Sequence, residues 1–172
     1  MPVENLLGEE GKGWAVTVSA LAHERSGISE VAGLAKQLDE VVELAKQATH
    51  NGRQASEQPS IRRRLAKADT IIEGMRLNGQ RFLTKQLKGE PLSSETSINK
   101  LHRAFLAIEL GDLALEVLGN ASQYLGGDET SGVDQNLWPN GVLDWPTVVI
   151  GGGTPNIQRN IIAERILGLP KD

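Results

Sequence analysis

The glycine run at residues 151–153 and the two residues after it have types that suit ligand binding. Three successive glycines allow positive φ angles and a close approach of the backbone to a ligand. Thr154 is a good helix N-cap, and Pro155 suits the first helical position. The spacing predicts either an ordinary capped helix start or a helix N-terminus whose free N–H groups face an anion.

Glu24 is the second candidate, because it is a carboxylate on the apolar stripe of a predicted helix. Its neighbours at helical spacing are apolar or small: Ala20, Leu21, Gly27 and Ile28. No cation on its own helix can therefore pair with it. Such a carboxylate pairs with a cation of another helix, has its pKa raised by desolvation, or stays partly in contact with water. The first interpretation is a structural ion pair, and the second is a general base.

Other chemistries find little support in the residue types. The chain has no cysteine, which excludes disulfides, thiolate metal sites and thiol nucleophiles. His23, His50 and His102 lack metal-ligand spacing and no Glu-x-x-His pair is present, so we expect no metal site. The arginine run at residues 62–64 either forms a solvated face or meets a phosphate of a ligand.

Long helices must position these residues. Apolar residues recur at three- and four-residue spacing over residues 12–49 and 59–87, and each stretch predicts one helix. A third helix is predicted from a cap at Ser93 or Ser94 to about Tyr124. Apolar residues surround much of this third helix, which predicts burial against two neighbours.

The last part of the chain is more mixed. Residues 126–141 are rich in Gly, Asp and Asn and predict a loop, and residues 142–150 predict a short helix or turn. A final helix follows the glycine run and stops at Gly168. Its expected core face is apolar: Ile157, Ile161, Ile162 and Ile166.

Composition sets the fold class and excludes several functions. Only 3% of the 172 residues are aromatic, so aliphatic packing of helices is favoured over a sheet. Short connections predict an all-α, up-down bundle of about four helices. The net charge of −4 argues against nucleic-acid binding, and no apolar run is long enough to span a membrane. The N-terminal segment is acidic rather than basic, which predicts a cytoplasmic protein without a signal peptide.

The string from Gly152 to Pro170 resembles the C-terminal signature of the acyl-CoA dehydrogenase family, GGT-x-x-IQRN-IIAER-x-LGLP. The strings PVENLLG at residues 2–8 and GKGW at residues 11–14 resemble the family's connection from its middle β domain into its last helical domain. The resemblance covers the whole chain but only the last part of a usual family protein. It implies that residues 1–11 are a linker from a missing middle domain and that residues 12–172 are the C-terminal helical bundle. We therefore expect a truncated gene product or an isolated domain.

The resemblance also implies a reaction. Acyl-CoA dehydrogenases remove the α-proton of an acyl thioester with a glutamate, while the β-hydrogen leaves as hydride to N5 of FAD. Most members carry this glutamate just before the last helix, where this chain has Gly152. A minority carry it on the first helix of this domain, directly before an arginine, and the matching pair here is Glu24 and Arg25. Glu24 is then the catalytic base, and Arg25 and Gly153 border the substrate.

Flavin contacts follow from the same resemblance. Thr154 and Asn156 would bind FAD. The family's Arg-x-x-Phe element, which contacts FAD of a neighbouring subunit, falls near residues 48–51 and is absent. Its Gln-x-x-Gly-Gly element begins here with Glu116, and a carboxylate would repel a pyrophosphate. This pattern is similar to bacterial members that work as heteromers of two unlike chains with fewer flavins than chains.

The leading hypothesis is thus the C-terminal domain of a FAD-dependent acyl-CoA dehydrogenase, inactive as an isolated fragment. Its implied partners are an acyl-CoA substrate, an electron-transfer flavoprotein or similar acceptor, and further subunits of a homo- or hetero-oligomer. The alternative is a non-catalytic helical assembly module or a partner subunit of a heteromeric dehydrogenase.

Overall fold

The computed structural model describes residues 2–24, 28–50, 52–90, 94–123 and 137–171. Within these ranges the regular secondary structure is helical except for one very small hairpin, which confirms the all-α prediction. The helices are α1 (Gly13–Glu24), α2 (Ile28–Gln47), α3 (Pro59–Leu87), α4 (Thr96–Leu118), α5 (Leu137–Asp144), α6 (Pro146–Ile150) and α7 (Pro155–Ile161). Short 3-10 helices at Val3–Asn5, Ala55–Glu57 and Gly119–Gln123 and a π turn at Ile162–Ile166 complete the helical structure.

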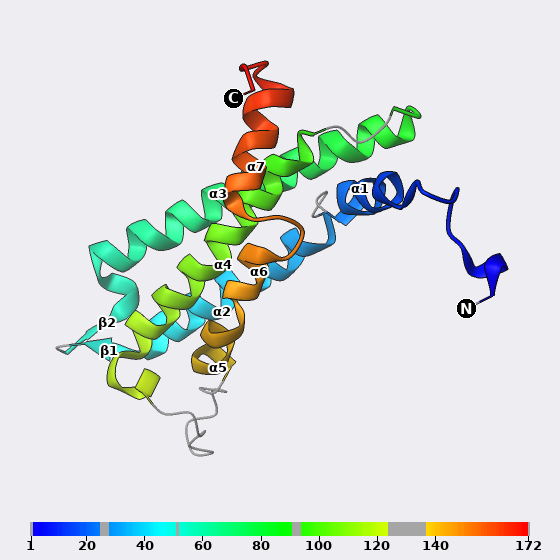
Figure 1. Cartoon of the computed structure of the whole chain (residues 1–172). Coiled ribbons are helices and arrows are strands. Elements are labelled where there is room, and N and C mark those ends of the chain that lie inside the picture. Colours follow the sequence, from blue (N-terminus) through cyan, green and yellow to red (C-terminus); the bar gives the residue numbers. More distant parts are fainter. Residues whose placement is uncertain (1, 25–27, 51, 91–93, 124–136, 172) are drawn as a thin grey trace.

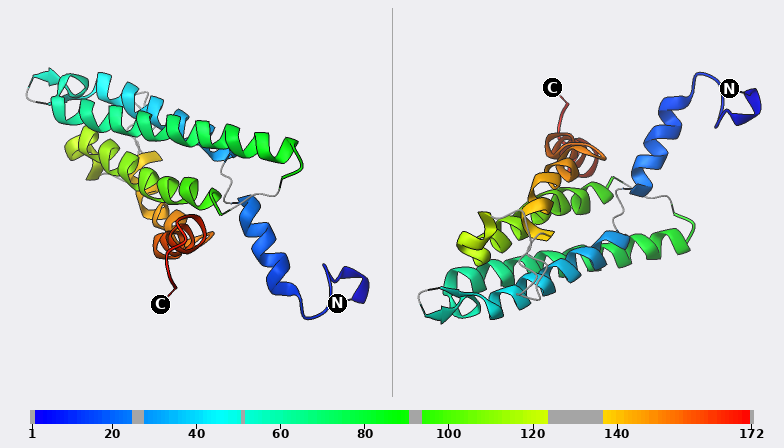
Figure 2. Two further views of the ribbon diagram at one scale, coloured as in Figure 1. Left: turned by 90° about the horizontal axis from the view of Figure 1, so that it is seen from above. Right: turned by 90° about the horizontal axis from the view of Figure 1, so that it is seen from below.

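Helix α4 lies at the centre of the bundle. It packs against α2 and α3 on one side and against α5, α6 and α7 on the other (Figures 1 and 2). The predicted burial of this helix against more than one neighbour is confirmed. Residues on α4 therefore reach both the long-helix core and the segment that carries the glycine run.

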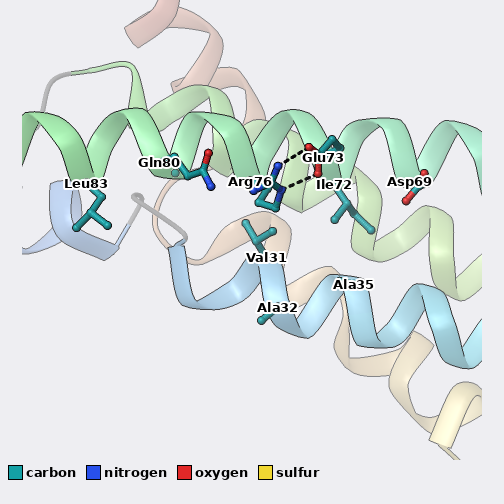
Figure 3. Close-up of a pocket in the computed structure, with 10 residues that line it drawn as sticks. Val31, Ala32, Ala35, Asp69, Ile72, Glu73, Arg76, Gln80 and Leu83 are labelled. Carbon is teal, nitrogen blue, oxygen red and sulfur yellow. Dashed lines mark hydrogen bonds and ion pairs between the residues drawn. The ribbon is translucent and has the colours of Figure 1, made fainter.

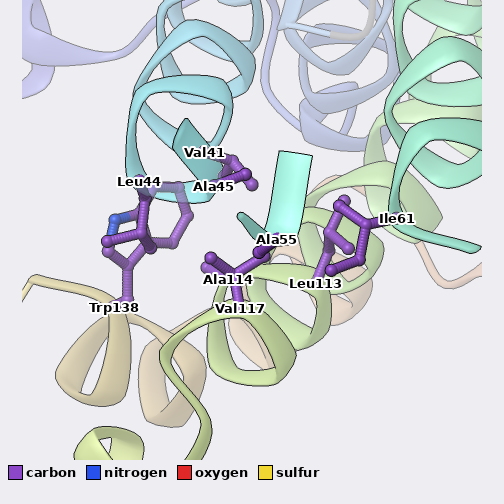
Figure 4. Close-up of a cluster of buried hydrophobic side chains, with 9 residues drawn as sticks. All are labelled: Val41, Leu44, Ala45, Ala55, Ile61, Leu113, Ala114, Val117 and Trp138. Carbon is purple, nitrogen blue, oxygen red and sulfur yellow. The ribbon is translucent and has the colours of Figure 1, made fainter. Parts of the chain in front are cut away.

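Two clusters of aliphatic side chains form the core, and α4 contributes to both. The cluster in Figure 4 joins the end of α2, the 3-10 helix Ala55–Glu57, the start of α3, α4 and α5. Its members are Val41, Leu44, Ala45, Ala55, Ile61, Leu113, Ala114, Val117 and Trp138. The second joins α2, α3 and α4 through Val31, Leu34, Leu38, Ala68, Ile72, Met75, Leu106 and Leu110. Burial of these side chains is the main favourable contribution to folding.

Helix α3 matches its prediction from end to end. It spans Pro59–Leu87, with Pro59 in its first turn, and Gly89 follows it at φ 75°. A proline there loses no hydrogen bond, because the first amides of a helix have no intrahelical partner. The β1 (Thr49–His50) and β2 (Arg53–Gln54) strands precede it as an antiparallel pair. This hairpin lies where the sequence predicts the end of the preceding helix.

The single helix predicted over residues 12–49 is wrong, because the structure has α1 and α2 in its place. Figures 1 and 2 show α1 lying outside the bundle, at the end opposite the hairpin. Trp14 on α1 is 77% exposed, and Val18 is also exposed. The apolar recurrence over residues 12–49 predicted a buried face, but a face is buried only where another element packs against it, and the described part of α1 has little such packing.

The loop predicted over residues 126–141 is wrong at its end, where α5 begins at Leu137; residues 126–136 lie outside the described ranges. Trp138 is 3% exposed and belongs to the core cluster of Figure 4. Its burial outweighs the low helix propensity of the proline, asparagine and glycine that follow. The short helix predicted over residues 142–150 is present as the end of α5 and α6.

The final helix is correctly placed, but its predicted core face is wrong. Ile157 is 48% exposed, and Ile161, Ile162 and Ile166 are only half-buried. The buried residue of α7 is Gln158. The helix ends before Gly168, which has φ 67°, as predicted.

The arginine run divides between solvent and an ion-pair cluster. Arg62 and Arg63 are exposed. Arg64 Nε donates to Glu109 on α4 at 2.8 Å, and its Nη1 pairs with Glu116. Burial alone would lower the pKa of Arg64, but the hydrogen bonds and charges of Glu109 and Glu116 outweigh it and raise this pKa above its ordinary value. The solvated-face interpretation thus holds for two of the three arginines.

We expect Arg64→Met to lower the free energy of unfolding by about 1 kcal/mol at low salt, because the two glutamates lose a partly buried cation. Urea denaturation measures this change. Arg63→Met is the matched control, since Arg63 is exposed and pairs with no acid in the described ranges, and it should change stability by less than about 0.5 kcal/mol. Equal effects of the two substitutions would show that the cluster adds nothing to stability. High salt should shrink the difference between them.

Candidate functional site

A pocket of about 290 Å³ lies where α1, α4, α6 and the glycine run meet. We call residues 151–154 the glycine loop. The pocket lining comes from all four elements: Leu21, Lys100, Arg103, Thr147, Val148, Gly151 and Gly152. Segments more than 120 residues apart in sequence therefore share one small site.

The glycine loop has a backbone that only glycine adopts readily. Gly152 has φ 68° and Gly153 has φ 106°. The Gly153 N–H donates to the carbonyl of Ile150 at 3.2 Å, which turns the chain back from the end of α6. Side chains at these two positions would be strained, so the run of glycines is needed for this turn.

Thr154 caps α7 as predicted. Its hydroxyl accepts a hydrogen bond from the Ile157 N–H at 3.5 Å. Thr154 and Asn156 are exposed, and Asn156 accepts a bond from Arg159 Nη1 at 3.0 Å. The Arg159 guanidinium, in the last turn of α7, also lies 5.4 Å from the ring centroid of Phe105 and so contacts α4.

Two cations line the pocket. Lys100 is 2% exposed, and its Nζ donates to the carbonyl of Val148 at 2.6 Å. Arg103 forms an ion pair with Glu30 in the first turn of α2. The sequence indicates Lys100 only by its spacing, since Ala104 and Ala107, four and seven residues later, are both buried. A lysine at such a position is expected to have a polar partner inside the fold.

The predicted base is on the helix that contributes Leu21 to this pocket. Glu24 is the last residue of α1, one turn after Leu21, which lines the pocket. The side chain of Glu24 and all of Arg25 lie outside the described part of the structure. The structure thus brings the helix of Glu24 to the glycine loop, while the roles of Glu24 and Arg25 stay predictions. Gly153 directly follows the pocket residue Gly152.

Gln158 is a further polar residue of the site. It is 1% exposed, and its Nε2 donates to the carbonyl oxygens of Gly152 and Gly153, both at 3.1 Å. The apolar pattern of the last helix predicted its isoleucines, and not Gln158, as the buried residues. A glutamine within one helical turn of a glycine loop was the available signal.

A second pocket, of about 420 Å³, lies between α2 and α3 (Figure 3). Its walls are mostly apolar, with Val31 and Ala35 on α2 facing Ile72 on α3. The charged residues Glu73 and Arg76 at its rim pair with each other at 2.6 Å. None of the predicted site residues lines it.

Among the described residues, no three histidine or acidic side chains are grouped as metal ligands. No described helix has the length and apolarity needed to cross a membrane.

A family model described as "Acyl-CoA dehydrogenase, C-terminal domain" matches residues 11–167. This chain belongs to the acyl-CoA dehydrogenase family. The acyl-CoA dehydrogenase IpdE1 of Mycobacterium tuberculosis is 32% identical over 169 residues, which are 97% of this chain and 41% of that protein. The chain therefore spans about two fifths of the length of the curated relatives it matches.

Solved structures of acyl-CoA dehydrogenase-like chains share the fold. The ChsE4-ChsE5 complex from Mycobacterium tuberculosis has a TM-score of 0.78 at 28% identity, covering 100% of this chain and 45% of that chain. "PigA with FAD and proline" has a TM-score of 0.78 at 26% identity, covering 98% of this chain and 42% of that chain. The helical bundle is thus the C-terminal helical domain of this family.

Proposed function

We propose that this chain is the C-terminal domain of a FAD-dependent acyl-CoA dehydrogenase that introduces an α,β double bond into an acyl-CoA thioester. The observation that carries the proposal is the pocket in which Leu21 of α1 meets Gly151 and Gly152. The helix that carries Leu21 and the position of Gly152 are the two places where family members carry the base, and the chain has a carboxylate at only one of them, Glu24. The middle and N-terminal domains would come from the rest of the enzyme.

In this proposal Glu24 accepts the α-proton of the thioester. A general base is most effective when its pKa lies near the working pH. When bound, FAD supplies the acceptor for the β-hydrogen, which leaves with its electron pair, so that the double bond forms between the α and β carbons. Arg25 and Gly153 border the acyl chain and exclude water from it. Electrons then pass to an electron-transfer flavoprotein or a similar acceptor, in the cytoplasm.

The residues at the glycine loop fit a flavin in their donor chemistry. Thr154 and Asn156 are exposed, uncharged hydrogen-bonding side chains at the start of α7. Because residues 151–153 are glycines, this stretch has no side chains and a ring system has room to approach the backbone. The relative PigA has been solved with FAD, which supports FAD as the cofactor.

A specific contact favours a heteromeric assembly. Glu116 takes the place of the family's glutamine at a cross-subunit flavin contact, and it pairs with Arg64 rather than standing free. The ChsE4-ChsE5 relative is a complex of two named chains. A partner subunit that lacks its own complete set of flavin contacts is therefore the second candidate function for this chain.

We expect the flavin-loaded enzyme that contains this domain to lose its oxidised-flavin absorbance band when mixed anaerobically with acyl-CoA substrates. The bleaching reports hydride transfer to the flavin. The isolated 172-residue chain should hold no stoichiometric flavin, because it supplies only one wall of the site. An enzyme that binds flavin but is bleached by none of a panel of short, long, branched and ring-bearing acyl-CoA thioesters would contradict the dehydrogenase proposal.

A further inference from the structure

The glycine loop is held at two points by buried polar side chains from different helices. Lys100 of α4 donates to the Val148 carbonyl at 2.6 Å, just before the loop. Gln158 of α7 donates to the Gly152 and Gly153 carbonyls at 3.1 Å each, inside the loop. The Gln158 side chain thus bonds to two peptide groups of the loop itself.

The two bonds from Gln158 fix the direction of two successive peptide groups. In a trans peptide the C=O and N–H bonds point in opposite directions. The Gly152 carbonyl faces Gln158, and the N–H of the same peptide group, on Gly153, points to the Ile150 carbonyl at 3.2 Å. The Gly153 carbonyl also faces Gln158, so the Thr154 N–H of the same peptide group points away from Gln158. Gln158 thereby sets the direction in which Thr154 presents its backbone donor.

The amide of Gln158 cannot turn over to satisfy its other end. Its Oε1 is buried and has no hydrogen-bond partner in the described part of the chain. Exchanging oxygen and nitrogen would place Oε1 against two carbonyl oxygens, which are acceptors only. An unpaired buried acceptor lowers stability. The Gln158 side chain therefore keeps its two bonds to the loop even though its own Oε1 is left without a hydrogen bond in the described part of the chain.

We propose that Gln158 is a positioning residue that holds the glycine loop so that Thr154 can bind the flavin. This inference rests on the proposed function, because Thr154 is a flavin contact only in a flavin-dependent dehydrogenase. Gln158 touches neither substrate nor flavin in this assignment and acts only through the loop. Without its two donors, the loop peptides can rotate, and glycines at positive φ have several other conformations open to them.

Gln158→Met tests the proposal, because methionine keeps the side-chain length and removes both amide donors. The first measurement is the exchange rate of the Gly153 amide hydrogen in the chain itself. Loss of the loop contacts should speed this exchange by about 3- to 10-fold. The second measurement is the flavin dissociation constant of the enzyme that contains this domain, which should rise by a similar factor, about 3- to 10-fold.

Two further variants control the experiment. Gln86→Met makes the same chemical change at an exposed glutamine at the end of α3 and should leave both measurements unchanged. Gln158→Asn keeps the amide but withdraws it by one methylene, so it should give the same effects in weaker form. It also provides the readout if the methionine variant does not fold.

The outcomes separate this inference from the proposed function. Faster Gly153 exchange together with weaker flavin binding supports Gln158 as a positioning residue. Unchanged exchange in both Gln158 variants overturns it, and faster exchange with unchanged flavin affinity shows a purely structural contact and also overturns it. In either case an unaltered enzyme that binds flavin and is bleached by acyl-CoA leaves the proposed function intact. An unaltered enzyme that binds no flavin overturns both.

Discussion

Glu24→Gln should lower the rate of flavin reduction by acyl-CoA about 100- to 10,000-fold in the enzyme that contains this domain, because the amide cannot accept the α-proton. The substitution keeps the shape of the side chain, so flavin content should not change. Since the loss falls on the chemical step, kcat should fall far more than KM changes. Anaerobic stopped-flow measurement of flavin bleaching gives the rate directly.

Glu57→Gln is the control for this substitution. Glu57 is exposed in the 3-10 helix Ala55–Glu57, on the side of the bundle away from the pocket, and its replacement should leave bleaching within about twofold. If Glu24→Gln also retains near-normal bleaching, Glu24 is not the base. A helical assembly module or a flavin-poor partner subunit would then be the better description of this chain.

Gly111→Ala should destabilise the bundle by about 1–3 kcal/mol, through overpacking. A Cβ at Gly111 would lie 1.7 Å from Cζ3 and 2.2 Å from Cε3 of Trp145, so the indole must move. Trp145 is packed edge-on against Trp138, with ring centroids 5.5 Å apart, and Trp138 is part of the buried core. Moving one ring therefore disturbs the other. Urea denaturation followed by circular dichroism measures the change.

Gly74→Ala is the matched control, because it makes the same change within α3 where a new Cβ would meet nothing within 4 Å. Alanine favours a helix over glycine, so this variant should gain up to about 1 kcal/mol. The two substitutions should thus change stability in opposite directions. Equal stability of the two variants would mean that Trp145 does not fill the space beside Gly111 in solution.

The long helices could be predicted because their apolar periodicity and their packing agree. In α3, the proline at its start, the glycine after its end and the stripe through Ile61, Ile72 and Phe82 all indicate one helix, and each of these three side chains is buried. The same rule fails for α1, where periodicity predicts a buried face that the described residues do not have. Periodicity reports which face an element can bury, and not whether anything covers that face.

The candidate site could be predicted only in part. The glycine loop and the cap at Thr154 depend on local backbone preferences, which sequence reports well. Lys100 depends on the carbonyl of Val148, 48 residues away, and no local pattern records such a partner. Gln158 is only five and six residues from the carbonyls that it binds, but the apolar pattern of its helix does not show that it is the buried residue. Buried polar side chains are therefore the part of this site that only the fold displays.

The three tryptophans lie in two parts of the molecule, helix α1 and the bundle core, and tryptophan fluorescence can distinguish these parts. Trp14 stands on the exposed α1, whereas Trp138 is enclosed in the core and Trp145 packs against it. A small collisional quencher such as acrylamide reaches the indole of Trp14 but not that of Trp138. The quenchable share of the emission thus reports on α1, and any protein surface that covers this helix will register as protection of a single indole.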